Sequence, residues 1–162
     1  MSNTPIDISI IIVNYKVKEY IANLLNSIRK ASSGLNLEIF VVDNNSGDDS
    51  ISYLKQIDSD VDYIQNVENI GFGKANNQAI RQAKGKYSLI INPDTLISED
   101  TLQTLVLHME KNESCGASGC KILNPDGTFA PESRRSVPTI WSAACKVFGL
   151  NVVFPNSKLF GK

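Results

Sequence analysis

The sequence has one histidine, three cysteines and no long apolar run, and each scarcity excludes a class of protein. The single histidine, His108, has no second histidine with which to build a zinc site or the acid–base centre of a serine hydrolase. Cys115, Cys120 and Cys145 lack paired metal-ligand spacing, so we expect reduced thiols that act as small core residues. The apolar run at residues 8–13 is far shorter than the roughly 20 residues of a membrane-spanning helix.

The net charge is also close to zero, because the sequence has sixteen basic and seventeen acidic residues, which give -1. No excess of positive charge attracts a polyanion, so we expect no nucleic-acid partner. The first residues, Met1 to Asp7, lack the basic start and apolar stretch of a signal peptide, which favours a cytoplasmic protein. The 162 residues suffice for one domain with its own core, and no linker divides them.

Apolar, β-branched segments alternate with segments of helical periodicity along the chain. We expect strands at residues 8–13, 37–43, 61–67, 87–91 and 115–122, and helices at residues 20–28, 50–56, 73–83, 98–109 and 141–148. This alternation is typical of βαβ units, which build an α/β, Rossmann-like fold with a mainly parallel sheet flanked by helices. Ligands of such folds bind at the carboxyl ends of the strands.

Polar clusters follow four of the expected strands, and parallel strands bring them to one edge of the sheet. These clusters are Asn14-Tyr15, Asp43 to Asp48, Asn69 to Asn77, and Asn92-Pro93-Asp94. One carboxylate at such an edge can accept hydrogen bonds from the ring N–H groups of a base, and another can hold a metal that bridges a pyrophosphate. The clusters therefore indicate a nucleotide-diphosphate site.

Three of these clusters also have structural interpretations. Asn92-Pro93-Asp94 is ordinary turn chemistry, in which an aspartate caps the next helix. Gly71 and Gly73, with Lys74, open a helix toward phosphate, or they merely permit a tight turn. Asp48 either contacts a ligand or caps the helix that follows it.

The order of these motifs resembles glycosyltransferase family two, which has the GT-A nucleotide-sugar-binding fold, and especially its bacterial rhamnosyltransferase-like branch. The resemblance rests on Val13-Asn14-Tyr15, Val42-Asp43-Asn44-Asn45-Ser46, Asn69-Ile70-Gly71-Phe72-Gly73 with Asn76, Asn92-Pro93-Asp94 and Asn124-Pro125-Asp126-Gly127. It covers nearly the whole chain, so we expect residues 1–162 to form a truncated GT-A domain, its N-terminal nucleotide-binding part.

The resemblance implies a set of site residues. Asp94 is expected to bind Mg²⁺ or Mn²⁺, in the position where many relatives have the second acid of an Asp-x-Asp motif, and Asn92 departs from the first acid. Asp43 is expected to bind the edge of a uracil or thymine ring. The full set of nucleotide-binding residues implied is Val13, Asn14, Tyr15, Asp43, Asn45, Gly71, Phe72, Lys74, Asn76, Asn92 and Pro93.

The family reaction transfers a sugar from a nucleotide diphosphate to an acceptor hydroxyl, usually with inversion at the anomeric carbon. The resemblance implies a dTDP- or UDP-linked donor, with rhamnose as the preferred sugar. It also implies a saccharide or lipid-linked acceptor in cell-surface polysaccharide assembly at the inner face of the cytoplasmic membrane. The general base of relatives lies in a later acidic motif that has no counterpart here, so we expect donor binding with little transferase activity.

Two other classes of function remain as alternatives. A non-catalytic nucleotide-sugar-binding or scaffolding module would associate, as a homo-oligomer or with a partner, through an uncovered sheet edge or a C-terminal apolar segment. The residues of that segment are Trp141, Val147, Phe148, Val152, Val153 and Phe154. A nicotinamide-dependent oxidoreductase is disfavoured, because Asn76 stands where the dinucleotide fingerprint needs a glycine and Asp43 precedes the glycines instead of following them.

Overall fold

The computed structural model describes residues 5–130, 140–149, 153 and 157 of the chain. The chain divides into two compact units, Met1–Ser118 and Gly119–Lys162. Val152 and Phe154 of the expected C-terminal apolar segment lie outside the described residues. Within the described part of the chain, no helix is long and apolar enough to span a membrane.

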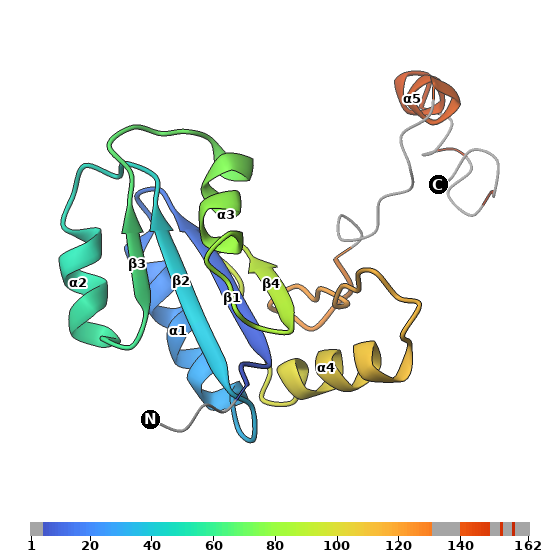
Figure 1. The fold of residues 1–162 in the computed structure, drawn as a ribbon. Coiled ribbons are helices and arrows are strands. Elements are labelled where there is room, and N and C mark those ends of the chain that lie inside the picture. The colour runs from blue at the N-terminus through green and yellow to red at the C-terminus, as the bar shows by residue number, and fades with distance from the viewer. Residues whose placement is uncertain (1–4, 131–139, 150–152, 154–156, 158–162) are drawn as a thin grey trace. The chain divides into compact units, whose positions relative to one another are not determined.

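The first unit is built on a parallel four-stranded sheet in the order β3-β2-β1-β4 (Figure 1). The strands are β1 (Ile8–Asn14), β2 (Leu37–Asp43), β3 (Asp62–Gln65) and β4 (Tyr87–Ile91). Every residue of β1 is buried, as a continuous β-branched run predicts for a central strand covered on both faces. The expected mainly parallel α/β sheet is therefore confirmed.

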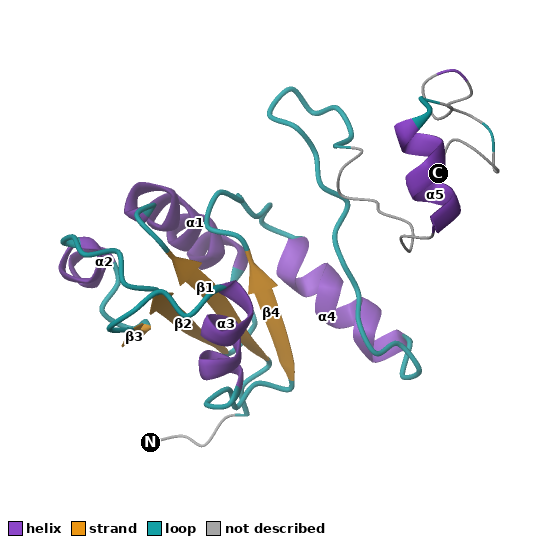
Figure 2. Ribbon diagram, turned by 90° about the horizontal axis from the view of Figure 1, so that it is seen from above, coloured by secondary structure: helices purple, strands orange, loops and turns teal. Residues whose placement is uncertain are grey.

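Helices cover both faces of this sheet, and Figure 2 shows α1 and α3 on opposite sides of it. The helices of the first unit are α1 (Lys18–Ala31), α2 (Ser50–Ile57), α3 (Phe72–Ile80) and α4 (Thr101–Lys111). One core joins β1 and β2 to α1, Leu54 of α2 and Leu102 of α4. The second core packs Ala75 and Ala79 of α3 against Phe40 and Val42. The small alanines let α3 approach the strands closely, which places its first turn at the edge of the sheet.

The strand expected at residues 115–122 does not form, and this prediction was wrong. Two glycines, Gly116 and Gly119, lie within it, and glycine loses more backbone entropy on ordering than any other residue. The other side chains at residues 115–120 are small, so the segment offers little apolar area to offset that cost. Within the described residues, β4 therefore pairs only with β1 and is an edge strand.

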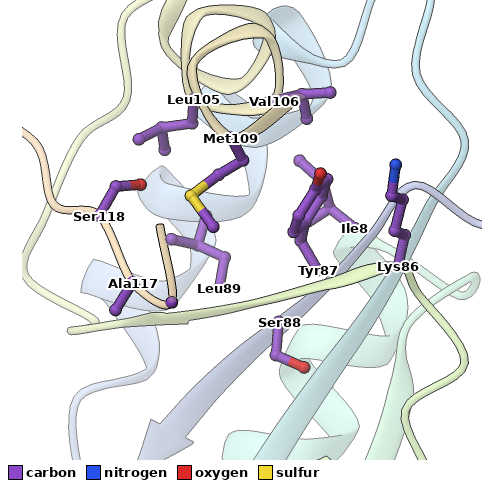
Figure 3. Close-up of a pocket in the computed structure, with 11 residues that line it drawn as sticks. Ile8, Lys86, Tyr87, Ser88, Leu89, Leu105, Val106, Met109, Ala117 and Ser118 are labelled. Carbon is purple, nitrogen blue, oxygen red and sulfur yellow. The ribbon is translucent and has the colours of Figure 1, made fainter. Parts of the chain in front are cut away.

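A cavity of about 350 Å³ lies beside β4 and α4, where Ala117 and Ser118 pass without pairing (Figure 3). Its apolar lining includes Leu89 of β4 and Leu105 and Met109 of α4. Tyr87, the first residue of β4, also lines it. The cavity thus lies along β4, and the carboxyl-end residues of β1 and β2 are not part of its lining.

Smaller differences from expectation concern element ends and cysteines. The helix expected from residue 98 begins at Thr101 instead. The amide of Thr101 donates to the Ser98 carbonyl at 3.1 Å, so residues 98–101 form a turn before the helix. Of the three cysteines, only Cys145 is buried; Cys120 is exposed and Cys115 is half-buried, so the expectation of core residues fails for these two.

The second unit contains an antiparallel bridge between Leu123 and Phe129 and the helix α5 (Ile140–Val147). The bridge closes the turn that Asn124-Pro125-Asp126-Gly127 predicts, and Gly127 takes the positive φ of 81° that this turn requires. The short helix expected at residues 141–148 is confirmed, with one residue of difference at each end.

At the amino end of the sheet, Gly85 packs directly on the backbone of β1. Its amide donates to Ser9 Oγ at 2.8 Å and to Glu38 Oε1 at 3.1 Å. Glu38 Oε1 also accepts from Ser9 Oγ at 2.6 Å and from the amide of Lys84 at 2.5 Å. The hydrogen bonds of one carboxylate oxygen thus join β1, β2 and the segment that leads into β4.

We predict that Gly85→Ala destabilises the protein. A Cβ at this position would stand 2.5 Å from Ser9 N and 2.8 Å from the Ile8 carbonyl carbon, so backbone must move. We expect a loss of about 1–3 kcal/mol in urea unfolding. Gly116→Ala is the matched control, because nothing lies within 4 Å of its Cβ position. Equal stability of the two variants would contradict the prediction.

Candidate functional site

The carboxyl ends of β1, β2 and β3 are joined by backbone hydrogen bonds. Asn14, the last residue of β1, pairs in register with Asp43, the last residue of β2. The amide of Asn44 then donates to the Asn14 carbonyl at 2.8 Å, and the amide of Asn66 donates to the Asp43 carbonyl at 2.9 Å. The polar residues that follow these strands are therefore held at one edge, as the sequence predicts.

A buried side-chain network lies between the ends of β1 and β2. Asn14 Nδ2 donates to Asp43 Oδ1 at 2.7 Å and to Ser46 Oγ at 3.0 Å. Ser46 donates to Asp43 twice, from its hydroxyl to Oδ1 at 2.5 Å and from its amide to Oδ2 at 3.2 Å. The three residues are 0%, 2% and 3% exposed. Asp43 thus keeps its carboxylate buried because three donors satisfy it.

Two loop residues next to this network adopt left-handed backbone conformations without being glycine. Lys16 has φ 61° and Asn45 has φ 64°. Such a conformation costs roughly 1–2 kcal/mol for a residue with a side chain, so the surroundings must impose it. Ser46 Oγ accepts the amide hydrogen of Lys16 at 3.0 Å and ties the two loops together. The network therefore positions both loops at the edge of the sheet.

A second network fixes the chain that enters α3. Asn44 Nδ2 donates to Asn69 Oδ1 at 2.7 Å, and Asn44 Oδ1 accepts from the amide of Ile70 at 3.1 Å. Asn66 Nδ2 reaches both Asn44 Oδ1 at 3.2 Å and Gln78 Oε1 at 3.0 Å. The amide groups join β2, β3 and α3, so the first turn of α3 has a fixed place relative to the strand ends.

The first turn of α3 presents polar groups to solvent. Gly71 precedes it with φ 84°, and Phe72 and Lys74 are exposed. The amide N–H groups of a first turn lack helical partners and carry partial positive charge, which favours anions. Asn76 is 4% exposed, and its Nδ2 donates to the Phe72 carbonyl at 2.8 Å. Its Oδ1 is buried without a hydrogen-bond donor among the described residues.

The turn after β4 carries Asp94, whose carboxylate is exposed and makes no hydrogen bond or ion pair with the part of the chain that the structure describes. The amide of Thr95 donates to the Asn92 carbonyl at 3.2 Å, so Asn92-Pro93-Asp94-Thr95 is also a turn. No group of three histidine, cysteine, aspartate or glutamate residues gathers in the described residues. A lone carboxylate still fits Mg²⁺ or Mn²⁺, since substrate phosphates and water complete their coordination.

Asp48 organises the turn that leads into α2, one residue before the N-cap Asp49. Its Oδ1 accepts from the Ser50 hydroxyl at 2.5 Å and the Ser50 amide at 2.9 Å, at the start of α2. These hydrogen bonds lower the pKa of the Asp48 carboxyl. The neighbouring Asp49 pairs with Lys18 and raises the pKa of that amine. These contacts give Asp48 a structural role before α2, and contact with a ligand stays a prediction.

The predicted site residues fall into two groups. Val13, Asn14, Asp43 and Asn76 are buried, and Val13 packs in the core beside α3. The exposed or half-exposed members are Tyr15, Asn45, Gly71, Phe72, Lys74, Asn92, Pro93 and Asp94. Sequence reasoning did not single out Ser46, Asn44 and Asn66 as organising residues. The sequence signal for Asn44 and Ser46 was their place in the polar turn that directly follows the apolar strand at residues 37–43.

We predict that Ser46→Ala lowers stability by about 1–3 kcal/mol. The substitution removes the hydroxyl that donates to Asp43, and it leaves Asn14 Nδ2 and the Lys16 amide without this acceptor. Urea unfolding followed by circular dichroism measures the change. Ser52→Ala is the matched control, since the Ser52 hydroxyl only donates to the Asp49 carbonyl at an exposed position. We expect that variant to stay within about 0.5 kcal/mol of wild type.

Comparison with known proteins identifies relatives of this chain. Residues 9–158 match the family described as Glycosyl transferase family 2. The chain is 32% identical over 157 residues to the low-salt glycan biosynthesis hexosyltransferase Agl10 of Haloferax volcanii. These residues are 94% of this chain and 47% of that protein. The chain is 29% identical over 111 residues to the poly(ribitol-phosphate) beta-N-acetylglucosaminyltransferase TarS of Staphylococcus aureus, covering 65% of this chain and 19% of the relative. The chain thus spans about half the length of Agl10, or less of other curated relatives.

Solved structures agree with these relatives. The S. aureus TarS fragment 1–349 in complex with UDP-GlcNAc has a TM-score of 0.60 at 27% identity, over 67% of this chain and 32% of that one. A mannosyltransferase from Pyrobaculum calidifontis in complex with GDP-Man and Mn²⁺ has a TM-score of 0.58 at 25% identity, over 66% and 33%. The fold is that of these GT-A-type neighbours. With the family match over most of its length, the chain belongs to glycosyl transferase family 2.

Proposed function

We propose that this chain carries the donor-nucleotide and metal site of a glycosyltransferase that moves a sugar from a nucleotide diphosphate to a cell-surface saccharide or lipid-linked acceptor. The observation that carries the proposal is the free Asp94 carboxylate. It follows β4, beside the central strand β1, whose end holds the buried network of Asn14, Asp43 and Ser46. The strand order reverses between β1 and β4, and ligands of open α/β sheets bind at such a switch point.

Each side chain has a proposed task. Asp94 holds a divalent ion, Mg²⁺ or Mn²⁺, which when bound offsets charge on the leaving diphosphate. The first turn of α3 and Lys74 face the phosphates with N–H groups and a cation. We assign Asp43 and Asn76, together with the chain at Asn14 and Tyr15, to the base and ribose. The buried Asn76 Oδ1 supports this assignment, because an unpaired buried acceptor calls for a donor from a ligand or water.

The relatives support a nucleotide-sugar donor but differ in its identity. One neighbour is in complex with UDP-GlcNAc and another with GDP-Man and Mn²⁺. We favour a dTDP- or UDP-linked donor and a rhamnosyl group, on the resemblance of Asn92-Pro93-Asp94 and Asn124-Pro125-Asp126-Gly127 to the rhamnosyltransferase-like branch. We also propose transfer with inversion, as is usual in the family.

For residues 1–162 by themselves we propose donor binding with little transfer, as the N-terminal part of a GT-A domain. The support is that the sequence of residues 1–162 contains no counterpart of the later acidic motif that supplies the general base in relatives. A cytoplasmic location at the inner membrane face is proposed as well, and three free thiols fit a reducing compartment. Self-association through the outer edge of β4 is the alternative by which the chain would serve as a scaffold.

We predict that Asp94→Asn removes the metal-dependent part of nucleotide binding. In isothermal titration with dTDP and UDP, we expect Mn²⁺ to tighten binding to the wild-type chain. The affinity of Asp94→Asn in Mn²⁺ should fall by at least about tenfold, or roughly 1.4 kcal/mol, to the level of the wild-type chain in EDTA. Asp62→Asn is the matched control, because Asp62 is an exposed aspartate at the start of β3.

Two results would contradict the proposal. If Asp94→Asn retains the full effect of Mn²⁺, the metal is held elsewhere. If the folded wild-type chain binds neither nucleotide, with or without the ion, the donor site itself is refuted, and light scattering would then test the scaffold alternative.

A further inference from the structure

Charge is divided unevenly along the chain, although the total is nearly zero. Residues 119–162 contain six basic and two acidic side chains, a net charge of +4. Residues 1–118 contain ten basic and fifteen acidic side chains, a net charge of -5. This boundary is also the boundary between the two compact units. The second unit is therefore a cationic segment attached to an anionic one.

The same cationic unit exposes large apolar side chains on and after α5. Trp141 is 54% exposed, Val147 is 82% exposed and Phe148 is 76% exposed. Trp141 and Phe148 are seven residues apart with Ala144 between them, a spacing that lines one face of a helix. The amide of Phe148 donates to the Ala144 carbonyl at 3.0 Å, so the helical geometry reaches this residue. Val153, 66% exposed, continues the apolar surface after Gly149.

We propose that this surface, formed by Trp141, Val147, Phe148 and Val153, docks on a membrane surface rich in anionic lipid. Exposed aromatic and aliphatic side chains on a short helix insert at the boundary between headgroups and acyl chains. The net charge of +4 attracts anionic headgroups. The apolar area and the charge together favour binding to such a membrane more than either would alone. This inference does not rest on the donor-nucleotide site, because it uses only residues of the second unit.

The charge also argues against a second copy of the chain as the occupant. Most homodimers are two-fold symmetric, so the same patch of each subunit would meet in the interface. Two segments of net charge +4 would then repel each other. An anionic bilayer satisfies the apolar side chains and the positive charge together.

The chain provides its own probe, because Trp141 is the only tryptophan in the sequence. The full chain is mixed with vesicles of phosphatidylcholine alone or of phosphatidylcholine with phosphatidylglycerol, and its emission and co-sedimentation are measured. We expect a blue shift and co-sedimentation with the anionic vesicles. Binding should weaken by at least about tenfold with neutral vesicles or at high salt.

Val147→Glu tests the surface directly, since it adds a negative charge at an 82% exposed side chain of α5. We expect it to reduce anionic-vesicle binding by at least about tenfold, with an unchanged circular dichroism spectrum. Val67→Glu is the same chemical change at a 94% exposed valine of the first unit, and we expect it to bind as the wild-type chain does.

Three outcomes would overturn the proposal. One is that the wild-type chain does not bind the anionic vesicles. A second is that Val147→Glu binds as tightly as Val67→Glu. The third is a blue shift that grows with protein concentration in the absence of lipid, with light scattering showing a dimer, because a second copy would then be the occupant. None of these readouts requires a nucleotide, so failure here is distinct from failure of the donor site.

Discussion

The buried carboxylate of Asp43 is the constraint on which the candidate site depends. An ionised group at 2% exposure is tolerated only when donors surround it, and here Asn14 and Ser46 supply those donors. Because one donor comes from the end of β1 and the others from the loop after β2, satisfying the charge fixes both strand ends. The strained backbone of Lys16 and Asn45 follows from the same requirement.

This arrangement divides the site into residues that organise and residues that are free to contact a ligand. The side chains of Asn44, Ser46 and Asn66 form hydrogen bonds with other protein groups. The side chains of Asp94 and Lys74 form no hydrogen bond or ion pair with the described part of the chain, and both are exposed. A donor site of this kind is prepared before its ligand arrives, which reduces the ordering cost of binding.

Much of this was predictable from local signals. The continuous apolar run of β1, the alternation of strands with helices, and polar residues after each strand predicted the parallel sheet and the edge where these residues meet. The failure at residues 115–122 has a physical cause, because pairing of a glycine-containing segment is decided by tertiary contacts that periodicity does not encode. The networks of Ser46 and Asn66 were also out of reach, since their long-range hydrogen bonds join residues that lie 12 to 32 positions apart in the sequence.

The position of β4 at the edge of the described sheet has a consequence for motion. β1 is buried along its whole length, whereas alternate residues of β4 are exposed and its outer edge is unpaired. Amide hydrogens of central strands exchange with solvent mainly through global unfolding, while edge strands open locally at lower free energy. The strand that leads into the Asp94 turn is thus expected to open more easily than the central strand β1. Occupation of the site would register first as slower hydrogen exchange along β4, before any change in the central strands.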